Sequence, residues 1–174
     1  MLMAMLESGG LRLVTDHHRP PDQDNPKGYY EFEQVKKLER NKEWVADAVG
    51  KGIKVVSALL KHLPASHTYK VIFMLRNTQE VLASQRQMLV RRGEQTGLTD
   101  GDLSKLLENH LVEIRNWLRQ QPNFDVLYLK YHDILRDPVR FCRIINGFLG
   151  SHFDEAKMVG AVDKALYRER ISSS

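Results

Sequence analysis

Short apolar runs alternate along this chain with longer stretches in which apolar residues recur every three or four positions. The run from Tyr69 to Leu75 is rich in β-branched and aromatic residues and too short for a helix, so it predicts a buried strand. Ile53–Ser57 is a second strand candidate, and Leu11–Thr15 is a third. These runs indicate a sheet whose strands are separated by helical segments.

The longer periodic stretches predict helices with recognisable ends. Asn77, followed three residues later by Glu80, is typical of a capping box, so a helix is expected to begin there and to end at Gly93. Further helices are expected at 1–10, at 102–120 and from Pro138 to about 149. The segment 31–49 is expected to form two short helices, with a break near Asn41. Strands that alternate with helices favour an α/β fold, in which a parallel sheet carries helices on both faces.

Composition narrows the class of protein without identifying it. With 174 residues and 42% hydrophobic content, the chain is expected to form a single domain, 1–174. The net charge is +4, and the basic residues are scattered among 22 acidic ones. This balance suits an anionic small-molecule ligand better than nucleic acid. No apolar segment approaches the roughly 18 residues of a membrane span, and Glu7 interrupts the N-terminal apolar stretch too early for a signal peptide. The single Cys142 cannot form an internal disulfide, and we expect a reducing, cytoplasmic compartment.

Arg76 and Ser84 are the first candidate binding residues. Arg76 follows the predicted strand directly, and Ser84 lies eight residues later, two turns into the predicted helix. An arginine offers a charged fork to phosphate oxygens and a serine adds one compact donor, so the pair is able to hold a phosphate. An arginine at a strand end and a serine in a helix are also ordinary surface residues, and the spacing alone does not separate these interpretations.

The segment Val71–Met88 resembles the 3′-phosphate-binding element of sulfotransferases, which consists of a strand, an arginine and a helix with a serine at the same spacing. The segment Val126–Gly150 resembles a second family element: a strand, a Tyr-x-Asp-hydrophobic turn, an Asp-Pro helix start and a Phe-Leu-Gly helix end. Similarity to bacterial sulfotransferase-like proteins extends over most of the chain. The resemblance implies a three-layer α/β/α parallel sheet of the P-loop nucleotide-binding type.

The family also places a Gly/Ser/Thr-rich phosphate loop between its first strand and first helix. Here Met1 is already expected to lie within the first helix, with neither a capping residue nor a strand before it. We therefore expect an N-terminally truncated or mis-started domain that lacks the first strand and the phosphosulfate-binding loop.

The resemblance implies roles for further residues. Arg76 and Ser84 would bind the 3′-phosphate of 3′-phosphoadenosine 5′-phosphosulfate, and Tyr131 would lie near the adenine. Arg168 and Arg170 would belong to a basic element that closes over the nucleotide, although the Arg-Lys-Gly form seen in many members is missing. The nucleotide is the co-substrate, and no metal is expected because no His/Cys/carboxylate cluster has ligand spacing.

The catalytic candidates are a cation and a base. Lys54 lies within an apolar run, where a lysine is uncommon unless its ammonium reaches water or an anion. His62, in Lys61-His-Leu-Pro64, resembles a short His-Leu-Pro sequence of animal sulfotransferases and has a suitable side chain for removing an acceptor proton. His17 and His18 compete for that role, and all of these histidines are also explicable as surface residues.

The expected activity is transfer of a sulfuryl group to a hydroxyl or amine of a small-molecule or peptide acceptor. Two alternatives stay open: a non-catalytic remnant that binds a nucleotide or a partner protein, and a P-loop kinase relative. The Arg76/Ser84 pair argues against the kinase, since it has no evident role in binding a simple triphosphate. The sequence leaves the oligomeric state and the acceptor undetermined.

Overall fold

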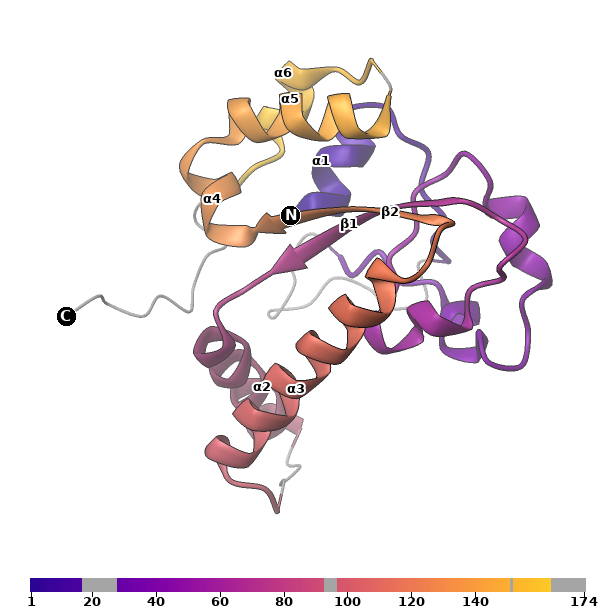
Figure 1. The fold of residues 1–174 in the computed structure, drawn as a ribbon. Coiled ribbons are helices and arrows are strands. Elements are labelled where there is room, and N and C mark those ends of the chain that lie inside the picture. The colour runs from indigo at the N-terminus through magenta and orange to yellow at the C-terminus, as the bar shows by residue number, and fades with distance from the viewer. Residues whose placement is uncertain (17–27, 93–96, 151, 164–174) are drawn as a thin grey trace.

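The computed structural model describes residues 1–16, 28–92, 97–150 and 152–163. In chain order the elements are α1 (Leu2–Ser8), the 3₁₀ helices η1 (Glu33–Lys37), η2 (Glu43–Ala48) and η3 (Ser57–His62), β1 (Tyr69–Leu75), α2 (Thr78–Arg92), α3 (Asp100–Arg119), β2 (Phe124–Lys130), α4 (Tyr131–Arg136), α5 (Pro138–Leu149) and α6 (Glu155–Gly160) (Figure 1). The strand predicted at 69–75 and the helices predicted at 1–10, within 31–49, and over 102–120 and 138–149 are confirmed. The two within 31–49 are 3₁₀ rather than α-helical.

The local sequence explains where several helices begin and end. Asn77 accepts a hydrogen bond from the Gln79 backbone N–H at 2.8 Å and so caps α2, as expected. Thr99 forms a complete capping box with Asp102 at the start of α3. Asp137 caps α5, whose first residue is proline, and Gly150 takes a left-handed conformation after its end, with φ at 66°. The predicted end of α2 at Gly93 lies outside the described residues.

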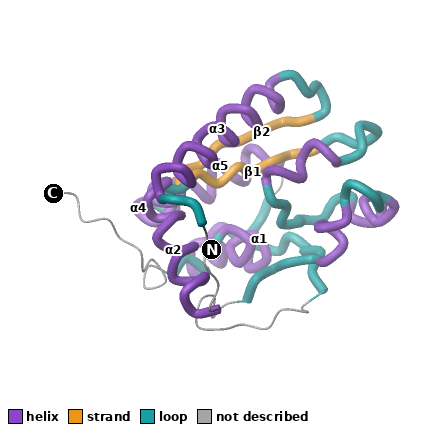
Figure 2. The backbone as a smooth tube through the Cα atoms, turned by 90° about the horizontal axis from the view of Figure 1, so that it is seen from below, coloured by secondary structure: helices purple, strands orange, loops and turns teal. Residues whose placement is uncertain are grey.

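β1 and β2 form a two-stranded parallel sheet, with Tyr69 opposite Phe124 and Leu75 opposite Lys130. Figure 2 shows the two strands side by side. Successive side chains of a strand point to opposite faces, so each strand supplies apolar residues to two separate clusters.

Helices cover both faces of this sheet. On one face, Ile72 and Met74 pack with residues of α1, α5 and α6 around the fully buried Met5, Ile145 and Met158. On the other face, the buried Phe73 packs with Leu60 of η3 and with α3, whose Ile114 and Leu118 are also buried. In Figure 1 the first group of helices lies above the strands and α3 below them. The described fold is thus α/β, a small two-stranded parallel sheet with helices packed on both of its faces.

The prediction of regular strands at Ile53–Ser57 and Leu11–Thr15 is wrong. The two segments meet at a single parallel bridge between Leu13 and Gly52, supported by a 2.9 Å bond from Val14 N to Gly52 O and a 2.8 Å bond from Gly52 N to Arg12 O. No longer ladder forms, since Ser57 already begins η3. The described residues therefore contain a smaller sheet than the three-layer P-loop architecture that the sequence led us to expect.

Candidate functional site

The candidate site lies where β1 and β2 end. Leu75 and Lys130 are paired in the parallel register, so the residues that follow them, Arg76 and Tyr131, emerge at the same edge of the sheet. The Arg76 Cζ atom lies 4.8 Å from the centre of the Tyr131 ring, within the range of a cation–π interaction. This contact joins two candidate residues that are far apart in the sequence.

An acidic residue, Glu80, completes this group. It is the buried charged residue of the described core, with 7% of its surface exposed. One of its oxygens lies 3.9 Å from a guanidinium nitrogen of Arg76, which lies two residues before the start of α2. The sequence indicated Glu80 only as part of a helix cap. The sequence does contain one sign of the contact: Glu80 follows Arg76 by four residues, a spacing at which oppositely charged side chains can meet.

The electrostatics of the site act on the Tyr131 hydroxyl. Burial raises its pKa above the ordinary value of 10.0; the Arg76 charge opposes this shift, and the charges of Glu80 and Asp163 add to it. Tyr131 is thereby kept neutral, and is suited to donating a hydrogen bond or stacking on a flat ligand. Arg76 is exposed and supplies the positive charge of the group.

Ser84 lies one turn beyond Glu80 on α2, and its side chain is exposed. The structure therefore leaves the hydroxyl accessible, on the helix that begins directly after Arg76. Arg168 and Arg170 lie outside the described residues, as do the competing histidines His17 and His18.

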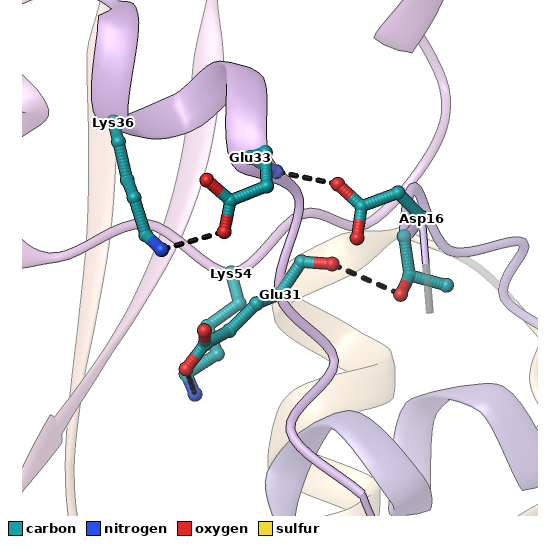
Figure 3. Close-up of polar contacts among 6 residues, drawn as sticks. Asp16, Glu31, Glu33, Lys36 and Lys54 are labelled. Carbon is teal, nitrogen blue, oxygen red and sulfur yellow. Dashed lines mark hydrogen bonds and ion pairs between the residues drawn. The ribbon is translucent and has the colours of Figure 1, made fainter. Parts of the chain in front are cut away.

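Lys54 is engaged within the protein. Its ammonium donates to the Tyr29 carbonyl at 3.0 Å and lies 3.6 Å from a Glu31 carboxylate oxygen. Figure 3 shows this pair beside a second set of contacts, in which Asp16 accepts a 2.6 Å bond from the Glu33 backbone N–H. The ammonium expected to act on an anion thus already has a carboxylate beside it.

His62 is half-buried in the last turn of η3. A different histidine has a specific partner: His110 of α3 is hydrogen-bonded through Nε2 to the Ser57 hydroxyl, 2.8 Å away. Sequence reasoning did not single out His110, because the pairing joins residues of two helices that meet only in the tertiary structure.

Within the described ranges, no group of three or more His, Cys, Asp and Glu side chains is arranged to hold a metal ion. Nor is any helix of the described part both long and apolar enough to cross a membrane.

The sequence model of the sulfotransferase family matches residues 16–155, which is well over half of the chain. These residues include β1, β2 and the Arg76, Glu80 and Tyr131 group at the ends of the strands. The chain therefore belongs to the sulfotransferase family, whose general activity is sulfuryl transfer. No curated protein and no solved structure matches it.

Proposed function

We propose that this chain binds 3′-phosphoadenosine 5′-phosphosulfate and transfers its sulfuryl group to a hydroxyl or amine of a small-molecule or peptide acceptor. The observation that carries the proposal is the stacking of Arg76 on Tyr131 at the common edge of the two strands. In sheets of this kind, ligands bind outside the carboxyl ends of the strands. Membership of the family supports the reaction class, and this contact supports a nucleotide site at this edge of the sheet.

Each side chain of the site has a role in this proposal. Arg76, held in orientation by the Tyr131 ring, offers its outer N–H groups to the 3′-phosphate, and Ser84 adds a hydroxyl donor from the next turns of α2. Tyr131 lies beside the adenine. Arg168 and Arg170 would add positive charge over the nucleotide, and the phosphosulfate end would need a phosphate loop of the kind that the family places before its first helix.

The transfer itself requires charge stabilisation and removal of one proton. The acceptor oxygen or nitrogen forms a bond to sulfur, the bond from sulfur to the bridging phosphate oxygen breaks, and adenosine 3′,5′-bisphosphate leaves with the electron pair. His62 is the proposed base. Lys54 is the proposed cation, and it would have to exchange Glu31 for the transferring group, since the two now lie 3.6 Å apart. The proposed compartment is the cytoplasm, and no metal takes part in the proposed step.

The direct test is calorimetric titration with adenosine 3′,5′-bisphosphate, using adenosine 5′-monophosphate to isolate the 3′-phosphate. Removing a charge-assisted hydrogen-bond donor costs about 1.5–3 kcal/mol, so Arg76→Ala should weaken bisphosphate binding by roughly 10- to 150-fold. Arg136→Ala is the matched control, because Arg136 is an exposed arginine of α4 paired with Asp133 instead. Equal affinity for the two nucleotides, or an unchanged affinity in a folded Arg76→Ala variant, would overturn the proposal.

One observation favours a second candidate, a module that binds the nucleotide without transferring the sulfuryl group. Lys54, the proposed cation, is held by Glu31 and by the Tyr29 carbonyl. If this arrangement persists with nucleotide bound, the chain binds without turnover. Bisphosphate binding combined with no transfer from the phosphosulfate to any acceptor in a mixed panel of phenols, alcohols and amines would select this candidate.

A further inference from the structure

Ser57 and His110 form a hydrogen-bonded pair across the fold. Ser57 is the first residue of η3, His110 lies in the middle of α3, and the two are 53 positions apart in the sequence. Their side chains are half-buried, and the Ser57 Oγ to His110 Nε2 distance is 2.8 Å. A serine hydroxyl within hydrogen-bond reach of an imidazole is the arrangement in which the imidazole can take the hydroxyl proton.

A hollow of about 240 Å³ lies beside this pair, between η3 and α3, lined by Ala58, Lys61, His110, Glu113, Ile114 and Trp117. The residues from α3 are spaced three and four apart, so one face of the helix forms one wall. Ile114 is buried and Trp117 half-buried, which gives the hollow an apolar part. Lys61 and Glu113 are exposed and bring one charge of each sign.

We propose that Ser57 is an acyl-accepting nucleophile and His110 its general base, and that the hollow takes small esters with an apolar acyl or aryl group. Three features support this. The nucleophile and base are already hydrogen-bonded. His110 lines the hollow, and that hollow has an apolar part for the ester.

The remaining polar side chains have assignable roles. Glu113 lies one turn along α3 from His110 and lines the same hollow, where its negative charge favours the imidazolium that forms when His110 takes the proton. Lys61, one turn along η3 from Ser57, supplies a positive charge for the oxyanion that develops on the ester carbonyl. None of these residues belongs to the Arg76, Glu80 and Tyr131 group, so this activity is separate from nucleotide binding.

The reaction balances without any further co-reactant. The Ser57 oxygen forms a bond to the ester carbonyl carbon, while His110 takes the hydroxyl proton. The bond from carbon to the leaving alkoxide or phenolate oxygen then breaks, and the leaving group receives the proton from His110. Water then attacks the acyl carbon while His110 takes a proton from it. The bond from carbon to the Ser57 oxygen breaks, Ser57 receives that proton from His110, and the acid is released.

Two probes test this on the intact chain: an alkyl fluorophosphonate, followed by intact mass and peptide mapping, and 4-nitrophenyl acetate, followed by release of nitrophenolate. We expect one adduct, at Ser57, and its loss in Ser57→Ala. His110→Gln keeps a hydrogen-bonding partner for Ser57 but removes the base, so labelling and nitrophenolate release should slow by about 10²-fold or more. Ser66→Ala is the matched control, because Ser66 is also bonded to a histidine, His67 at 3.0 Å, but is exposed and away from the hollow. Ser66→Ala should leave the rates of labelling and of nitrophenolate release unchanged.

A urea midpoint for each variant shows whether it has folded. The proposal is overturned if the folded wild-type chain gives no adduct at Ser57, or if chain unfolded in urea labels at the same rate. An unchanged labelling rate in folded His110→Gln would also overturn it, and would leave the pair as a structural tie between η3 and α3.

Discussion

Neutralising Glu80 should tighten nucleotide binding. Its carboxylate lies 3.9 Å from the Arg76 guanidinium, the group proposed to receive the 3′-phosphate. That separation is too long for a direct hydrogen bond, so at this contact Glu80 acts on Arg76 by charge. The Tyr131 ring, 4.8 Å from Arg76, is in contact with the guanidinium. The change Glu80→Gln keeps the size of the side chain and removes the charge that repels an incoming phosphate.

The magnitude follows from Coulomb's law. A phosphate bound to Arg76 would place its oxygens about 6 Å from the Glu80 carboxylate, where two unit charges interact by about 0.7 kcal/mol at the dielectric of water. Because Glu80 is buried, this figure is a lower limit, and a phosphate of about −1.5 to −2 charge experiences a repulsion of about 1 kcal/mol or more. Removing it should lower the dissociation constant for adenosine 3′,5′-bisphosphate about fivefold or more.

The assay is calorimetric titration of the wild type and Glu80→Gln at low and at high salt. The gain in affinity of Glu80→Gln over the wild type should shrink at high salt, because the Debye length falls from about 10 Å at 0.1 M to about 3 Å at 1 M. Adenosine 5′-monophosphate should show a smaller gain. Glu43→Gln, an exposed acid in η2, is the control for net charge. Unchanged or weaker binding by folded Glu80→Gln would refute the reasoning and would assign Glu80 a role in holding Arg76 in place.

Three further predictions concern stability and reactivity. Burial raises the pKa of the Cys142 thiol to about 11, so alkylation at pH 8 should be slow in the native chain and fast in urea, as followed by mass. Burial and the hydrogen bond to Glu7 raise the pKa of Tyr30 to about 12. Below pH 10 the unfolded and folded chains both keep this proton; between pH 10 and about 12 only the folded chain does, so stability should fall there, and Tyr30→Phe should flatten the fall in urea titrations. Asp137→Ala removes the cap of α5 and should cost about 1 kcal/mol of unfolding free energy, whereas Asp137→Asn should cost little; equal losses would contradict capping.

Local sequence accounts for much of the fold because its signals act over a few residues. Asn77, Thr99 and Asp137 cap the helices that follow them, and the apolar run 69–75 forms a strand. The same reasoning failed at Ile53–Ser57. That run has strand-like residues, but a strand needs a partner along its length, and the described residues supply a single bridge at Gly52.

The class of this protein follows from its amino-acid sequence: it is an α/β protein of the sulfotransferase family, in which Arg76 and Ser84 have the spacing expected of a phosphate-binding element. Which side chains meet depends on the tertiary structure. The parallel register of β1 and β2 brings Arg76 to Tyr131, and the packing of α3 against η3 brings His110 to Ser57. The sequence placed Arg76 and Tyr131 at the ends of strands and so favoured a shared site, but their direct contact, like that of His110 with Ser57, depends on how distant segments pack.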